Sequence, residues 1–167
     1  MMSDASEGNP EDPPDRVHVL NRQRRFKICG MSVASFCDAL LRTLGQPAQT
    51  LSVVFVSARR MRRINHQYLG RDYATDVLSF SYERVIAEGS PFLGEIIIAP
   101  EIALEQAVRY RADPEREVRK LLVHGVLHLL GYNHETDQGR MNRVQAGLTR
   151  RKFFAESPAL ADLRVRR

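Results

Sequence analysis

Three of the five histidines lie in one eleven-residue segment, HGVLHLLGYNH, at positions 124, 128 and 134. His124 and His128 are four residues apart, so a helix would place both imidazoles on one face. Gly131 can end that helix and turn the chain, which would let His134 return toward the same face. Three neutral imidazoles leave one coordination position open, as in catalytic rather than structural zinc sites. We therefore predict one Zn2+ per chain, held by His124, His128 and His134.

A hydrogen-bonded core histidine is the simpler alternative for any one of these residues. Three of them would each need an acceptor in an apolar segment, so the metal site is the better interpretation. The spacing H-x3-H-x2-G-x2-H is also that of metzincin zinc peptidases, in which a glutamate after the first histidine is the general base. Gly125 holds that position here. A peptidase would lack its proton acceptor, whereas a metal with neutral ligands could attract an anionic phosphodiester.

The charge distribution favours a polyanionic partner. Residues 1–15 carry five acidic residues and no lysine or arginine, so residues 16–167 hold all 25 basic residues against 15 acidic ones, a net charge of +10. A domain this basic attracts nucleic acid through long-range fields and counterion release. The charge alone names no particular nucleic acid.

The sequence shows no sign of a membrane or secreted protein. No run of about eighteen apolar residues occurs, which excludes a transmembrane helix. Residues 1–15 lack the basic start and apolar core of a signal peptide. Two cysteines, Cys29 and Cys37, are too few for a disulfide framework in a chain of 167 residues. We expect a cytoplasmic protein with no membrane association.

The first half of the chain predicts two strands and two helices. Val17 and Val19 alternate with polar neighbours, and LSVVFVS (51–57) is a β-branched apolar run, so both segments predict strands. Apolar residues at helical spacing over 33–44 predict a helix capped by Ser32. A second helix is predicted over ARRMRRINHQYL (58–69), between Ser57 as cap and Gly70 as stop. It carries three arginines that could line an RNA-binding groove or form a solvated face, namely Arg59, Arg62 and Arg63.

The second half predicts two further strands, DVLSFSY (76–82) and LGEIIIA (93–99), which could pair antiparallel across the loop between them. A helix should begin at Pro100, and another at Asp113 and Pro114. This last helix runs to Gly131 and is apolar on almost every side, so it should be the central, metal-binding helix. A final helical segment contains Met141, which could lie beneath a metal site but is more commonly a core residue.

These elements predict one α+β domain, in which a small mixed sheet packs against helices. We assign the domain to residues 16–155. Residues 1–15 contain three prolines and no apolar periodicity, so we expect a disordered acidic tail. Residues 156–167 look like a frayed basic tail.

The segment LLVHGVLHLLGYNHE, with TDVLSF and LGEIII upstream of it, resembles the YbeY family of bacterial metallo-endoribonucleases, from about Val17 through the segment after Met141. The resemblance implies a compact α+β fold and zinc held by His124, His128 and His134. It further implies single-strand-specific RNA cleavage, maturation of the 3′ end of small-subunit ribosomal RNA, and ribosome quality control in the cytoplasm. The implied partners are single-stranded or ribosomal RNA, the small ribosomal subunit and its assembly factors.

The chain departs from the family pattern at several positions. The family often has an arginine, linked to activity, where this chain has Leu69. Arg71 lies two positions later, on a connection from which a long side chain can reach a neighbouring cleft. We therefore predict that Arg71 takes over that role. Asn133 and Glu95 stand where the family commonly has aspartate.

Other functions fit the same residues. A non-catalytic ribosome-assembly protein could bind RNA with its basic surface and hold a structural metal, and a zinc peptidase is disfavoured by Gly125. For the nuclease, either water or the RNA 2′-hydroxyl could attack phosphorus. The residues do not choose between the two nucleophiles.

Overall fold

The computed structural model describes residues 16–82 and 91–163 of the chain. Its main sheet has four strands in the order β1-β3-β5-β4, which are β1 (Val17–Asn21), β3 (Thr50–Phe55), β5 (Phe92–Ile98) and β4 (Val77–Ser81). β1, β3 and β5 are parallel, while β4 pairs antiparallel with β5. The mixed sheet and the α+β class are confirmed.

The middle strands β3 and β5 are mostly apolar, because residues on one face join the main hydrophobic core, while Val54 and Ile97 on the other face pack with Met61. Gly94 lets β4 approach β5 closely: a Cβ there would lie 2.1 Å from the carbonyl oxygen of Phe80, and its φ of +146° excludes most side chains. β4 is the last strand of the sheet, so its outer edge is free of strand pairing within the part of the chain described.

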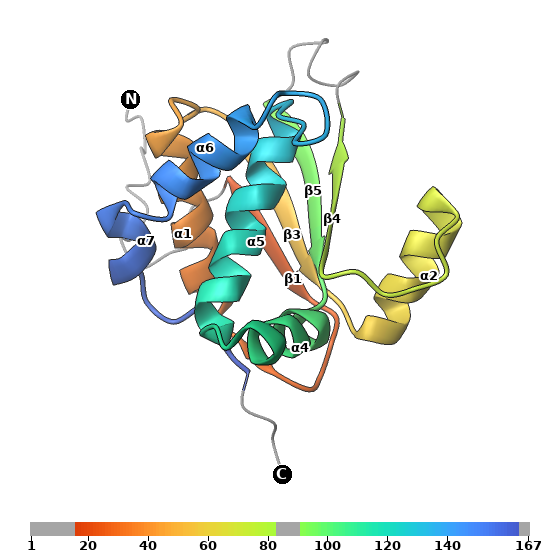
Figure 1. Ribbon diagram of the computed structural model, residues 1–167. Coiled ribbons are helices and arrows are strands. Elements are labelled where there is room, and N and C mark those ends of the chain that lie inside the picture. The colour runs from red at the N-terminus through yellow and green to blue at the C-terminus, as the bar shows by residue number, and fades with distance from the viewer. Residues whose placement is uncertain (1–15, 83–90, 164–167) are drawn as a thin grey trace, which may run out of the picture.

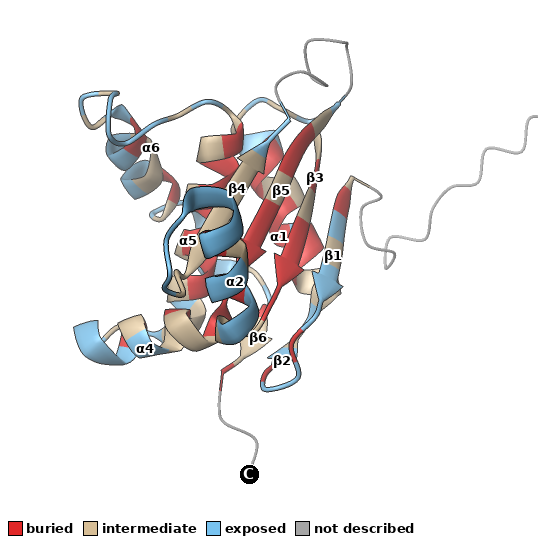
Figure 2. Cartoon of the chain, turned by 90° about the vertical axis from the view of Figure 1, so that its right-hand side faces the viewer, coloured by how far each residue is buried: buried red, intermediate tan, exposed pale blue. Residues whose placement is uncertain are grey.

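Helices form unequal layers on the two faces of the sheet (Figure 1). One face carries α1 (Gly30–Thr43) and α5 (Pro114–Leu129), with α6 (Arg140–Leu148) and α7 (Lys152–Glu156) packed outside them. α4 (Pro100–Tyr110) packs against α5 below the sheet. Among the described helices, only α2 (Ala58–Leu69) crosses the other face, and it covers only part of that face (Figure 2).

Local sequence signals explain how two of these helices begin and end. The Asp113 side chain accepts hydrogen bonds from the N–H groups of Glu115 and Arg116 at the start of α5. α5 is buried along most of its length, so the predicted central helix is confirmed. Ser57 caps α2 and Gly70 ends it in the left-handed conformation, both as predicted.

The predicted start of the first helix is wrong. α1 begins at Gly30 with Cys29 as its N-cap, so Ser32 lies inside the helix. Its hydroxyl lies 3.1 Å from the Cys29 sulfur. The apolar stripe used for the prediction begins only at Val33, because the first helical turn is partly exposed.

The predicted C-terminal tail, 156–167, is also partly wrong. β6 (Ala161–Asp162) pairs antiparallel with β2 (Lys27–Ile28), and Leu160 is fully buried. Arg119 on α5 donates to the carbonyl oxygen of Ser157 at 2.8 Å, and Glu115 accepts from the N–H of Leu160 at 2.7 Å. The folded domain therefore continues through Leu163, because backbone pairing and two buried leucines, Leu160 and Leu163, hold this segment to the core.

The predicted acidic tail, residues 1–15, lies outside the described residues. Within those described, no helix has the length and apolar character needed to cross a membrane.

Candidate metal centre

The three predicted ligands come together near the C-terminal end of α5. His124 and His128 project from the same face of the helix and are half-buried, while His134 is exposed. The Nε2 atoms of His124 and His128 lie 3.0 Å apart, and His134 Nδ1 lies 3.3 Å from His128 Nε2. The sequence spacing thus produces a cluster of three imidazole nitrogens.

Gly131 and Asn133 bring His134 back to the helix. Gly131 adopts a φ of +87° just after the end of α5, a conformation that glycine adopts without strain. The Asn133 side chain then accepts a hydrogen bond from the N–H of Glu135 at 3.0 Å, and its carbonyl accepts from the N–H of Asp137 at 2.9 Å. These two turns reverse the chain, so the predicted role of Gly131 is confirmed.

The cluster fits a zinc ion in both geometry and charge. Two nitrogens bound tetrahedrally at the usual Zn–N length lie roughly 3.3 Å apart, close to the separations seen here. Burial lowers the pKa of His124 and His128, and the neighbouring imidazoles lower it further. Both rings are therefore neutral at pH 7, which is the form that binds a metal ion.

Gln145 and Asp76 form a second layer around His124. The Gln145 side-chain oxygen lies 3.1 Å from His124 Nδ1, and the negative charge of Asp76 raises the pKa of His124 against the effect of burial. The Asp76 side chain also accepts a hydrogen bond from the N–H of Val77 at 2.8 Å, at the start of β4. His124, Gln145 and Asp76 line a small cavity of about 160 Å³. Gln145 was not predictable from the sequence, because no motif marks a glutamine on α6.

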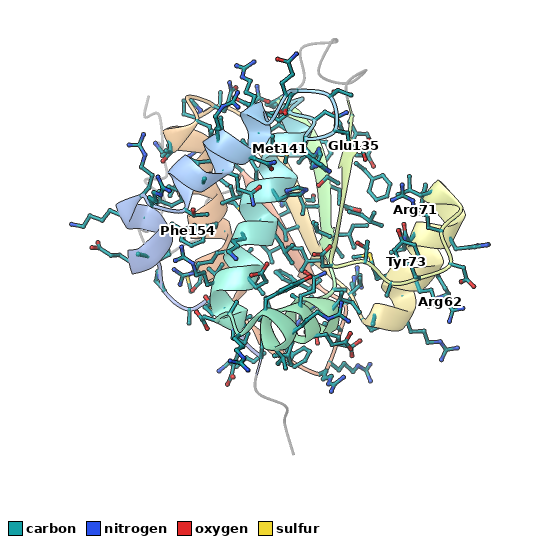
Figure 3. All side chains as sticks on the ribbon, in the orientation of Figure 1. Arg62, Arg71, Tyr73, Glu135, Met141 and Phe154 are labelled. Atoms are coloured by element: carbon teal, nitrogen blue, oxygen red, sulfur yellow. The ribbon has the colours of Figure 1, made fainter. Side chains whose placement is uncertain are left out.

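A cavity of about 350 Å³, here called the histidine cavity, opens beside the three imidazoles. The cavity is lined by Leu69 at the C-terminal end of α2 and by Arg71 two residues later. Four residues of β4 also line it, namely Val77, Leu78, Ser79 and Ser81. Arg71 is exposed and lies between α2 and β4 (Figure 3). It has no ion-pair partner among residues 16–82 and 91–163. The structure thus brings Arg71 to the same cavity as His124, His128 and His134.

The other candidate arginines lie elsewhere. Arg59, Arg62 and Arg63 line a separate hollow of about 440 Å³ with His66 and Asp72. Arg62 makes two 2.8 Å hydrogen bonds to the Asp72 carboxylate, which partly neutralises it. The structure does not bring these arginines to the histidines.

Two residues of the zinc-peptidase pattern have structural roles here. Met141 is fully buried in the core among the helices (Figure 3). A Cβ on Gly125 would lie 2.8 Å from Cγ2 of Ile96, so the missing side chain lets α5 lie directly on β5. A glutamate at position 125 could not be accommodated without displacing the sheet.

Comparison with known proteins agrees with this fold and shows a family. The family model described as "Endoribonuclease YbeY" matches residues 18–151, which is most of the chain. The chain therefore belongs to this family and is, by class, a nuclease that acts on RNA.

Individual relatives support the same assignment. An "Endoribonuclease YbeY" from Thermodesulfovibrio yellowstonii is 35% identical over 77% of this chain and 90% of its own length. One from Helicobacter pylori (strain Shi470) is 44% identical over 61% of this chain and 71% of its own length. The solution structure of TM1509 from Thermotoga maritima is similar with a TM-score of 0.55 and 27% identity, over 84% of this chain and 87% of that one.

Proposed function

We propose that this chain is a zinc-dependent endoribonuclease specific for single-stranded RNA. On this proposal it matures the 3′ end of small-subunit ribosomal RNA and acts in ribosome quality control in the cytoplasm. The observation that carries the proposal is the placement of Arg71 and three imidazoles around one open cavity, in a chain that belongs to a family of endoribonucleases.

His124, His128 and His134 would hold the metal. A bound zinc ion supplies Lewis-acid stabilisation of the charge that develops during phosphodiester cleavage. The three ligands are neutral, so they leave the charge of the ion available to an anionic substrate. Gln145 would hold the His124 ring with its Nε2 toward the metal, because the amide oxygen accepts the proton on Nδ1.

Arg71 would bind the phosphate. Its guanidinium is free of ion pairs among the residues described and lines the histidine cavity. A planar guanidinium can donate two parallel hydrogen bonds to phosphate oxygens, and it stays charged at any physiological pH. Either water or the RNA 2′-hydroxyl could then attack the phosphorus held in this position.

Small ribosomal subunits and their assembly factors are the proposed partners, since the substrate would be presented on such particles. The positive net charge of the folded domain would draw it to exposed RNA. A non-catalytic assembly factor would use the same surface and would hold the metal without cleaving RNA.

The test is cleavage of a small-subunit precursor RNA with a single-stranded 3′ extension by the nuclease-free purified protein. We expect cuts in the extension, loss of cutting when a complementary strand covers it, and loss with a chelator. Matched variants His128→Ala and His66→Ala separate the site from a contaminant, because His66 is a solvent-facing histidine on α2. Tight binding of the RNA without any cut would support the assembly factor instead. Peptide turnover by the same preparation would revive the peptidase.

A further inference from the structure

Another hollow, of about 590 Å³, lies on the face of the sheet opposite α5. We call it the sheet pocket. Val54, Val56 and Ile97 of the central sheet region and residues of α2 line it. Figure 2 shows α2 in front of this face of the sheet. The hollow falls within the usual volume range for small-ligand sites, and thus has room for a nucleobase. Its lining includes charged and aromatic side chains, namely Arg22, Arg60, Tyr68, Phe80, Tyr82 and Glu95.

Three aromatic side chains line this pocket, and two of them, Tyr68 and Tyr82, are exposed. Tyr68 on α2 is 62% exposed and its ring centroid lies 5.2 Å from that of Phe80 on β4. Tyr82, just after β4, is 45% exposed. Exposed rings beside a groove are the surfaces on which single-stranded RNA stacks its bases, and such stacking tolerates any base sequence.

The polar residues of the pocket favour an anionic strand. Arg22 and Arg60 are exposed, and neither has an ion-pair partner in the described parts of the chain. Among the described residues that line the pocket, Glu95 is the one carboxylate against two arginines. Guanidinium groups can bind successive phosphates, while a carboxylate can accept from the N–H groups of a base. The combination fits a nucleotide better than an apolar peptide.

The sheet pocket and the histidine cavity adjoin each other. Ser81 lines both, and the consecutive residues Tyr68 and Leu69 at the end of α2 line one each. β4 separates them and is an edge strand, so no neighbouring strand of the described chain blocks the way over its outer side. A single RNA strand can therefore pass from one hollow to the other around β4.

We propose that the sheet pocket binds a nucleobase of the substrate strand, a few nucleotides from the phosphate held at the histidines. The base stacks on Tyr68, and Arg22 and Arg60 bind the adjoining phosphates. This inference rests on the proposed nuclease function. It adds a substrate-binding site on the opposite face of the sheet from the metal.

The test uses single-stranded RNA with 2-aminopurine, a fluorescent base that is quenched by stacking, placed at successive positions. Binding is measured with the full chain carrying His128→Ala, so that cleavage does not interfere. We expect quenching at one position, loss of that quenching in Tyr68→Ala, and about tenfold weaker binding, as for one lost stacking contact. Tyr68→Phe should retain the quenching and the parental affinity, because it keeps the aromatic ring. Tyr110→Ala is the matched control, since Tyr110 is also a strongly exposed tyrosine (72%) but lies on α4.

The outcomes separate this inference from the nuclease proposal. If the parent protein cleaves RNA while Tyr68→Ala binds and quenches like Tyr110→Ala, the sheet pocket is not a base site and the nuclease function stands. If the parent does not cleave RNA, the nuclease function fails whatever Tyr68 does. A change of oligomeric state in Tyr68→Ala with quenching unchanged would make this face an interface between copies and would overturn the inference.

Discussion

The side-chain oxygen of Gln145 lies 3.1 Å from Nδ1 of His124, across the contact between α6 and α5. An imidazole that donates its Nδ1 proton keeps the lone pair of Nε2 for a metal, and here that Nε2 faces His128. Donation from Nδ1 to this oxygen would set both the tautomer and the direction of His124, the first ligand of the predicted site.

Replacing Gln145 should weaken zinc binding. Gln145→Leu removes the acceptor and replaces the amide side chain with an apolar one of similar size. We therefore expect zinc affinity to fall by about tenfold to a hundredfold. Competition with a chromophoric chelator measures this. Asn142→Leu is the control, because Asn142 is exposed on the same helix. Equal affinities of the two variants would remove Gln145 from the site.

Arg71 should matter for cleavage and Arg62 should not. We expect Arg71→Ala to lower kcat/KM for RNA by about tenfold or more, equivalent to roughly 1.4 kcal/mol of transition-state stabilisation. Zinc content and Tm should stay at parental values, because Arg71 is exposed and has no ion pair among the residues described. Arg71→Lys should recover only part of the loss, since lysine cannot bind bidentately.

The control for this prediction is Arg62→Ala, which removes an exposed arginine already paired with Asp72. Exposed pairs contribute little to stability, so this variant should fold and cleave like the parent. Parental cleavage by Arg71→Ala would leave Arg71 as an ordinary surface residue.

Much of the fold was predictable because it depends on local patterns. Ser57 and Gly70 bound α2, Asp113 and Pro114 start α5, and β-branched runs mark β3 and β5. The clustering of His124, His128 and His134 was predictable for the same reason, because helical spacing and one glycine determine where their side chains meet.

The remaining features depend on tertiary packing that local patterns do not encode. Gln145 reaches His124 only because α6 packs on α5. The arginines of α2 could not be assigned from charge, since the position of this helix decides that they line a different hollow from the histidines. The pairing of β6 with β2 joins residues more than 130 positions apart. The local sequence of residues 156–167 therefore predicted a frayed tail and not a strand.

Two glycines should respond to alanine in opposite directions. Gly125→Ala places a Cβ about 2.8 Å from Ile96, so we expect a loss of about 1–3 kcal/mol in the free energy of unfolding, despite the better helix propensity of alanine. Gly147→Ala on α6 has open space around it and should stabilise the protein by up to about 1 kcal/mol. Urea denaturation measures both. A neutral Gly125→Ala would show that α5 can move away from β5 without cost.

The two cysteines should differ in reactivity. Hydrogen bonds from Ser32 lower the pKa of the exposed Cys29, whereas burial raises the pKa of Cys37 to about 12. Iodoacetamide should therefore label the folded protein once, at Cys29, as read by mass spectrometry. In the unfolded chain Cys37 loses its proton near pH 9, which the folded chain retains, so the free energy of unfolding should fall as pH rises above that value. Labelling of Cys37 before unfolding would contradict its burial.

Zinc titration into the metal-free protein, with cleavage of single-stranded RNA followed at each step, tests the central claim most directly. The cleavage rate should rise in proportion to bound zinc and level off at about one zinc per chain, the stoichiometry of a three-histidine site. His66→Ala should follow the parent, and His128→Ala should bind little zinc and cleave little RNA at any point. Cleavage at the full rate without zinc, or full zinc occupancy in His128→Ala, would contradict a catalytic metal at His124, His128 and His134.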